Sequence, residues 1–170
     1  AYDGNSDVYV MSVHGGEITR VTFHPGADTV VGWHPRSNKI LFRSPRRAYS
    51  RFERLYLISP DGSGLEELMM HEAVAGSFSA DGTQIAYNRI ARESRTWKRY
   101  RGGTAQDIWL FNMKTHKDRC LTEFAGTDRT PMWIGDKIYF SSDRKRVLNL
   151  FAYDPDSDRI IEIATVVTDA

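Results

Sequence analysis

The sequence of 170 residues contains a single cysteine, Cys120. One cysteine excludes an internal disulfide framework of the kind that stabilises small secreted domains. Cys120 lies in the alternating run 118–122, and such alternation is typical of a strand. We therefore expect Cys120 to be a buried strand residue that acts as a small apolar side chain, and not a reactive thiol.

Long apolar runs are also absent. No uncharged apolar stretch approaches the ~20 residues that cross a bilayer. The first residues lack the basic and then apolar pattern of a signal peptide. Neither a membrane segment nor a secretory leader is therefore predicted.

The common catalytic motifs are missing as well. There is no Gly-x-Ser-x-Gly elbow, no His-Glu-x-x-His helix and no glycine-rich phosphate loop. His71-Glu72 is followed by residues 73–75, which supply no second histidine. The five histidines fall at turns or strand ends, where a solvated side chain is a better interpretation than a metal ligand. We expect no catalytic residue, no metal and no cofactor in this chain.

Sustained helical periodicity is absent, and short apolar runs separated by turn residues replace it. An aromatic residue closes the first run of each of three copies, at Trp33, Phe78 and Trp133. The second runs contain Ile40, Ile85 and Ile138, which are 45 and 53 residues apart. Self-similarity at roughly 40 to 50 residues, with several strands in each unit, is typical of propeller blades.

The predicted fold is therefore all-β. It is a partial β-propeller with about three four-stranded antiparallel blades and a two-stranded half blade. We expect one incomplete propeller segment over residues 1–170, with a half blade at 7–23 and blades at 29–70, 75–122 and 130–163. The aromatics at the ends of the first strands should fill the space between neighbouring sheets. A second set should pack within the sheets: Tyr9, Tyr56, Trp109 and Phe151.

Basic residues gather in three loops, although the formal net charge is only +1. Residues 43–54, 89–101 and 143–146 carry net charges of +4, +5 and +2. Each loop joins the second and third strands of its unit, so all three should lie on one rim. Such a rim would attract carboxylates, including peptide C-termini, through bidentate arginine contacts. The candidate binding residues are Arg46, Arg47, Arg95, Trp97, Lys98, Arg99, Tyr100 and Arg101.

The basic loops have two other interpretations. They can be solvated surface, or they can dock onto adjacent domains, with Trp97 and Tyr100 holding the long loop in place. This structural use is favoured over peptide guidance. Nucleic-acid binding is the least favoured use, and it is considered because arginines interleaved with aromatics also bind phosphates and stack on bases.

Several motifs resemble the TolB-type propeller repeat, whose pattern is roughly P-x-W-S-P-D-G-x-x-I-A-F-x-S-D-R. These motifs are Pro131-Met132-Trp133, Ser79-Ala80-Asp81-Gly82 and Ser142-Asp143-Arg144. A closer resemblance lies in residues 95–109, 127–133 and 149–154. These segments are similar to the first, six-bladed propeller of the tricorn protease family.

The tricorn resemblance implies a large cytoplasmic serine peptidase that trims oligopeptides released by the proteasome. Its propellers gate and channel peptides, and its catalytic residues lie further along the polypeptide. The chain is then a noncatalytic segment whose partners are oligopeptides or other domains of the peptidase. The alternative is a TolB-like protein–protein interaction module that is not attached to a peptidase.

Three and a half units leave open sheet faces where six units would close a ring. We expect one of these faces to expose Val8, Val10, Ile18 and Val21. Two or more copies would then associate through the open edges, so a homo-oligomer is predicted.

Overall fold

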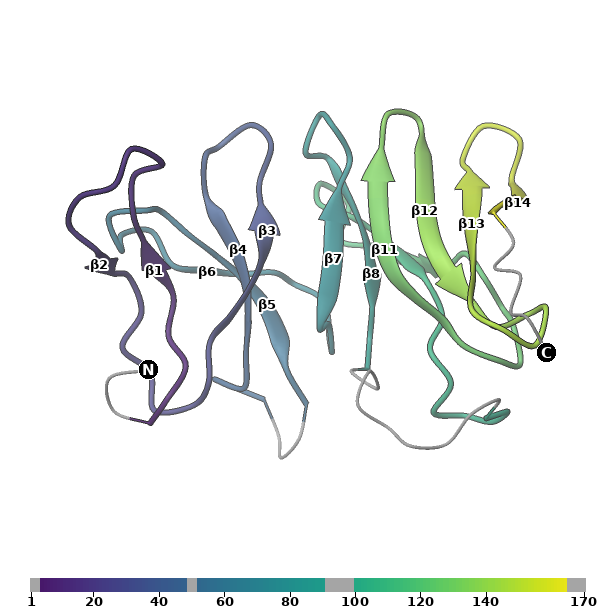
Figure 1. Cartoon of the computed structure of the whole chain (residues 1–170), viewed down its shortest axis with the longest axis horizontal. Helices are drawn as coiled ribbons and strands as arrows, with labels where there is room; N and C mark the ends of the chain where they lie inside the picture. Colours follow the sequence, from purple (N-terminus) through teal and green to yellow (C-terminus); the bar gives the residue numbers. More distant parts are fainter. Residues whose placement is uncertain (1–3, 49–51, 91–99, 165–170) are drawn as a thin grey trace. The chain divides into compact units, whose positions relative to one another are not determined.

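A computed structural model of the chain describes residues 4–48, 52–90 and 100–164 (Figure 1). These residues form strands and no helix, so the predicted all-β class and the partial propeller are confirmed. Accordingly, no helix in the described part of the chain could span a membrane. The chain forms two compact units, residues 1–74 and 75–170. Each is described separately below.

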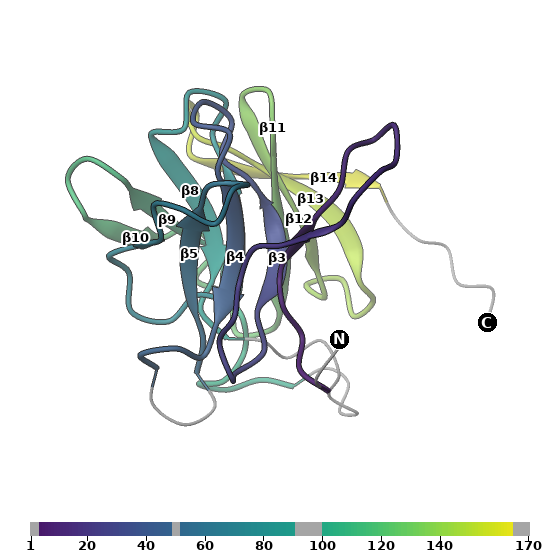
Figure 2. The same ribbon diagram turned by 90° about the vertical axis from the view of Figure 1, so that its left-hand side faces the viewer.

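The first unit contains a two-stranded sheet and a four-stranded sheet, and the strands of each follow one another in chain order. The two-stranded sheet consists of β1 (Tyr9–Val10) and β2 (Thr19–Arg20). The four-stranded sheet consists of β3 (Thr29–Trp33), β4 (Ile40–Ser44), β5 (Arg54–Ile58) and β6 (Glu66–Glu67). Neighbouring strands are antiparallel, and β3, β4 and β5 lie side by side in Figure 2.

The second unit contains two four-stranded antiparallel sheets. The first consists of β7 (Ala75–Phe78), β8 (Gln84–Asn88), β9 (Trp109–Asn112) and β10 (Asp118–Cys120). The second consists of β11 (Asp128–Ile134), β12 (Lys137–Ser142), β13 (Asn149–Asp154) and β14 (Arg159–Ala164). Strand β11 packs against β7 and β8, so the two sheets share a core.

The core of the first unit lies between its two sheets. Val8 and Val21 are 0% and 4% exposed and pack against the apolar side chains of β4 and β5. The prediction that these two valines are exposed is therefore wrong, because this face of the β1–β2 hairpin covers the neighbouring sheet. Met11 and Ile18, by contrast, are more than half exposed.

The core of the second unit confirms one of the predicted inter-sheet aromatics. Trp133 packs against a buried cluster that includes Ala86 of one sheet and Phe140 of the other. Its backbone N–H also donates to the Ser77 hydroxyl at 2.8 Å. Phe78 is buried as well.

Trp33 does not occupy a buried position, since its side chain is 52% exposed. The prediction that it fills an inter-sheet space is wrong for a structural reason. Trp133 packs against a four-stranded sheet, whereas the β1–β2 sheet has no strands equivalent to β7 and β8. Within the described residues, Trp33 therefore lacks the surface that buries its counterpart.

Candidate functional site

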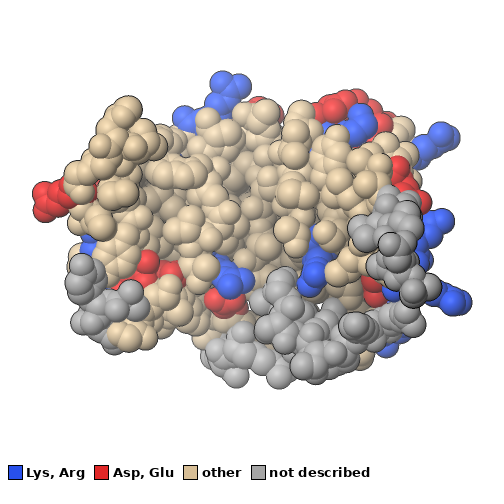
Figure 3. Space-filling model, in the orientation of Figure 1, with Lys and Arg blue, Asp and Glu red and all other residues tan. Residues whose placement is uncertain are grey.

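The predicted basic rim is described only in part. Arg46 and Arg47 follow β4, while Tyr100 and Arg101 lie between β8 and β9. The remaining candidates lie outside the described residues: Arg95, Trp97, Lys98 and Arg99. On the face drawn in Figure 3, basic side chains are scattered among acidic ones.

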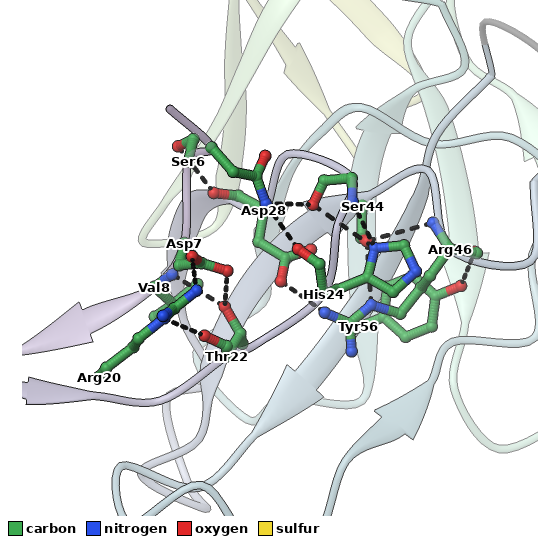
Figure 4. Close-up of polar contacts among 12 residues, drawn as sticks. Ser6, Asp7, Val8, Arg20, Thr22, His24, Asp28, Ser44, Arg46 and Tyr56 are labelled. Carbon is green, nitrogen blue, oxygen red and sulfur yellow. Dashed lines mark hydrogen bonds and ion pairs between the residues drawn. The ribbon is translucent and has the colours of Figure 1, made fainter. Parts of the chain in front are cut away.

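Arg46 belongs to a buried polar network rather than to an open surface (Figure 4). Its Nη2 atom lies 2.5 Å from Asp28 Oδ2, and the two side chains are 13% and 0% exposed. Its Nε atom donates to the Ser44 hydroxyl at 2.9 Å. The guanidinium is therefore neutralised by Asp28 and largely closed to solvent.

Aromatic rings complete the environment of Arg46. The guanidinium carbon lies 5.1 Å from the centre of the Phe42 ring and 5.4 Å from that of Tyr56. The Tyr56 hydroxyl donates to the Arg46 carbonyl oxygen. Burial, with the nearby Glu67 carboxylate, raises the pKa of Tyr56, so this donor stays protonated at neutral pH. Arg46 therefore connects the start of β3, the end of β4 and β5.

Arg47 differs from its neighbour because its side chain is 80% exposed. It lies 3.5 Å from Glu67, a distance at which an exposed ion pair contributes little. Its backbone φ is +57°, which turns the chain sharply after β4. In the described part of the first unit, Arg47 is the candidate best placed to meet a ligand from solvent.

The second unit contains a copy of the same network. Arg144 Nη2 lies 2.7 Å from Asp128 Oδ2, and Arg144 Nε donates to the Ser142 hydroxyl at 2.9 Å. The Arg144 guanidinium lies 5.6, 5.1 and 5.0 Å from the ring centres of Phe140, Phe151 and Phe124. Burial raises the pKa of Asp128, and the Ser142 hydroxyl and Arg144 act in the opposite direction.

The backbone hydrogen bonds repeat with the side chains. Val8 N–H donates to Thr22 Oγ1 and Ile108 N–H to Thr122 Oγ1, both at 2.9 Å. Asp28 N–H donates to the Ser6 carbonyl just as Asp128 N–H donates to that of Gln106. Each aspartate therefore links a β1-type strand to the next sheet by its backbone and holds an arginine by its side chain.

Sequence reasoning missed both aspartates, although a signal was present. Identical residues recur at a constant spacing of 100 positions: Asp7 and Asp107, Thr22 and Thr122, Gly26 and Gly126, Asp28 and Asp128, and Trp33 and Trp133. The search for repeats compared adjacent units, whereas these copies are separated by a complete blade. That intervening blade has Val74 opposite the end of its second strand, where the other two have aspartate.

Arg101 is anchored by the last sheet. Its Nη1 atom lies 3.0 Å from both carboxylate oxygens of Asp143, and its guanidinium lies 5.1 Å from the Phe124 ring centre. Asp143 Oδ1 also accepts the Thr127 N–H at 2.9 Å. The Arg101 side chain is 41% exposed, so this pair can exchange with solvent. Tyr100 is half-buried beside it.

The cysteine and the histidines have structural roles. Cys120 is half-buried in β10, where burial raises the pKa of its thiol to about 11. It is therefore a thiol, and not a reactive thiolate, at neutral pH. His24 Nδ1 accepts the Gly26 N–H at 2.9 Å, and His34 Nδ1 accepts two backbone N–H groups in the β3–β4 turn. No metal-binding group of three or more acidic, histidine or cysteine residues occurs within the described ranges.

The whole chain matches a known family. The family model described as the tricorn protease N-terminal beta propeller domain covers residues 1–169. Tricorn protease homolog 1 of Streptomyces coelicolor is 29% identical over 150 residues, which are 84% of this chain and 14% of the relative. The tricorn protease of Thermoplasma acidophilum is 28% identical over 158 residues, which are 89% of this chain and 14% of the relative. The chain thus spans about one seventh of each relative.

Solved structures have the same fold. The crystal structure of the tricorn protease superposes with a TM-score of 0.79 at 24% identity, over 96% of this chain and 17% of that one. TolB from Acinetobacter baumannii superposes with a TM-score of 0.73 at 17% identity, over 92% of this chain and 37% of that one.

Proposed function

The chain belongs to the family of tricorn protease N-terminal β-propeller domains, and from this we propose that it is a noncatalytic segment of a tricorn-like serine peptidase. In this proposal the peptidase acts in the cytoplasm on oligopeptides produced by the proteasome. The segment serves as a scaffold, gate or channel for these peptides. The observation that carries the proposal is the family match over residues 1–169.

The internal use of charge supports the scaffold part of the proposal. Arg46 and Arg144 are neutralised by buried aspartates and enclosed by aromatic rings. Groups held in this way fix the ends of strands and are poorly placed to bind anions from solvent. The two networks therefore favour a rigid framework.

The exposed cations support the peptide-guidance part. Arg47 is mostly exposed, and Arg101 is held by a solvent-accessible pair. A peptide carboxylate could bind Arg47 directly or compete with Asp143 for Arg101. With them we retain the residues predicted from the sequence, Arg95, Lys98 and Arg99.

A binding titration tests the peptide-guidance proposal. Acidic oligopeptides should bind the chain weakly at low salt, and binding should weaken as salt increases. The Arg47→Ser variant should bind less tightly, whereas Arg36→Ser should not. Arg36 is an exposed arginine in the β3–β4 turn, at the other end of β4. Equal loss in both variants, or no binding at low salt, would leave only the scaffold role.

A TolB-like interaction module outside any peptidase is the second candidate, and the structural likeness to TolB shows only the fold. The two candidates differ in the complete polypeptide. A peptidase should hydrolyse oligopeptides, and a TolB-like module should not.

We also propose self-association through open sheet faces. Met11, Ile18 and Trp33 are 55%, 58% and 52% exposed. Large apolar side chains that gather on a surface often mark an interface. Light scattering after size exclusion should give a mass above 19.4 kDa at tens of micromolar protein. A monomer at that concentration would overturn this proposal.

A further inference from the structure

The first copy of the 100-residue repeat contains a complete site for a guanidinium group (Figure 4). Arg20 Nη2 lies 2.5 Å from Asp7 Oδ2, and Arg20 Nε donates to the Thr22 carbonyl at 3.0 Å. The Arg20 guanidinium carbon also lies 4.7 Å from the centre of the Phe23 ring. A carboxylate, a carbonyl and a ring face thus bind one arginine of the same hairpin.

The second copy retains the acceptors and lacks the arginine. Asp107 and Thr122 replace Asp7 and Thr22, whereas Cys120 stands at the position of Arg20. The strand registers confirm this equivalence, since Arg20 is paired with Tyr9 and Cys120 with Trp109. A cysteine side chain is too short to place a cation beside Asp107.

A second carboxylate replaces the aromatic ring. Glu123 stands at the position of Phe23. The place that holds a neutral ion pair in the first copy therefore has two carboxylates and no cation in the second. Asp107 Oδ1 accepts the Phe124 N–H at 3.2 Å, but neither Asp107 nor Glu123 forms an ion pair within the described ranges.

The neighbouring cations are already engaged. Arg144 is paired with Asp128, and Arg101 with Asp143. Burial, together with the charges of Asp128 and Glu123, raises the pKa of Asp107. Burial also raises the pKa of Cys120, and the same carboxylates contribute to that increase. Both shifts have the sign expected when a positive charge is lost from this position.

We propose that Asp107, Glu123 and the Thr122 carbonyl form a binding slot for the guanidinium of an arginine side chain supplied by a peptide or an adjacent protein. The incoming group takes the place that Arg20 occupies in the first copy. A planar guanidinium suits this set because it can donate to a carboxylate and to a carbonyl at the same time. The inference does not depend on the peptidase assignment, since it rests on the comparison between the two copies.

The Phe124 amide provides a direct signal, because its N–H donates to Asp107. A Gly-Arg-Gly peptide blocked at both ends should shift the Phe124 amide resonance in a saturable manner. The matched Gly-citrulline-Gly peptide has nearly the same shape and no charge, and it should produce no saturable shift. Failure of the arginine peptide to shift this resonance would overturn the proposal.

Four variants locate the slot. Asp107→Asn and Glu123→Gln remove one charge each, and Asp107→Asn should weaken binding by about tenfold or more. Cys120→Arg restores the arginine of the first copy, so it should raise the melting temperature and abolish peptide binding. Cys120→Ala is the control and should bind like the unchanged protein. A saturable shift that persists in Asp107→Asn, or in a folded Cys120→Arg variant, would contradict the assignment.

Discussion

The carboxylate of Asp28 and the guanidinium of Arg46 form an ion pair at 2.5 Å that connects the residue before β3 to the loop after β4. Asp28 is fully buried and Arg46 is almost so. Because the pair also contacts Ser44 and two aromatic rings, it is part of the framework of the sheet.

Removing one member of this pair should strongly destabilise the fold. In Arg46→Ser the Asp28 carboxylate stays buried without its cation, which typically costs about 3–5 kcal/mol. Denaturant unfolding of the chain measures this loss. Arg47→Ser is the matched control and should change the free energy of unfolding by no more than about 0.5 kcal/mol. Equal unfolding midpoints for the two variants would show that the Asp28–Arg46 pair is not structural.

The two tryptophans that are 100 residues apart should differ in their contribution to stability. Trp133→Ala removes a side chain that packs against the shared core of the second unit, and it should cost about 3 kcal/mol or more. Trp33→Ala removes a side chain that is half exposed, and it should cost about 1 kcal/mol or less. Thermal melting of both variants checks this. A larger loss for Trp33 would contradict the exposure described here.

The strands could be predicted from the sequence because apolar alternation and turn residues are local signals. The runs at Ile40, Ile85 and Ile138 lie in β4, β8 and β12. Burial between sheets is not local, and this explains the error at Trp33. The repeat makes Trp33 and Trp133 equivalent, but only the structure shows that the sheet preceding Trp33 has two strands.

The candidate site could be predicted only as a pattern of charge. The sequence shows that Arg46 and Arg47 are both basic, but it does not show that one is buried against Asp28 and the other exposed. The two partners are 18 residues apart, and no local rule connects them. The spacing of 100 residues between Asp28 and Asp128 was the available clue.

The pH dependence of stability should change when Asp107 is replaced by asparagine. The pKa of Asp107 is raised above its ordinary value of 3.8, so its protonated form favours the folded state. This contribution is present below the pKa of the unfolded chain and is lost as the pH rises through the folded pKa. Asp107→Asn should therefore gain stability relative to the unchanged protein between pH 4 and pH 7.

Urea unfolding at the two pH values measures this difference. Asp7→Asn is the matched control, since Asp7 is paired with Arg20 and its loss should destabilise the protein at pH 7. If Asp107→Asn loses stability relative to the unchanged protein as the pH rises, the carboxylate has a cation partner and the slot is already filled.

Gly126 should be required by the Arg101–Asp143 pair. A Cβ atom at this position would lie 2.1 Å from Arg101 Nη1 and 2.2 Å from Asp143 Oδ1, so Gly126→Ala must displace both groups. A cost of about 1–3 kcal/mol is expected. Gly103→Ala is the control because nothing lies within 4 Å of its added Cβ. Equal melting temperatures for the two variants would mean that Arg101 is not anchored by Asp143.

The central claim is that this chain holds peptides without cleaving them, and one incubation tests it most directly. A mixture of acidic oligopeptides is incubated with the purified chain at low salt, and the bound and free fractions are then analysed by mass spectrometry. We predict that peptides are retained by the chain and recovered intact. Cleavage products that persist through repurification of the chain would contradict its assignment as a noncatalytic propeller segment.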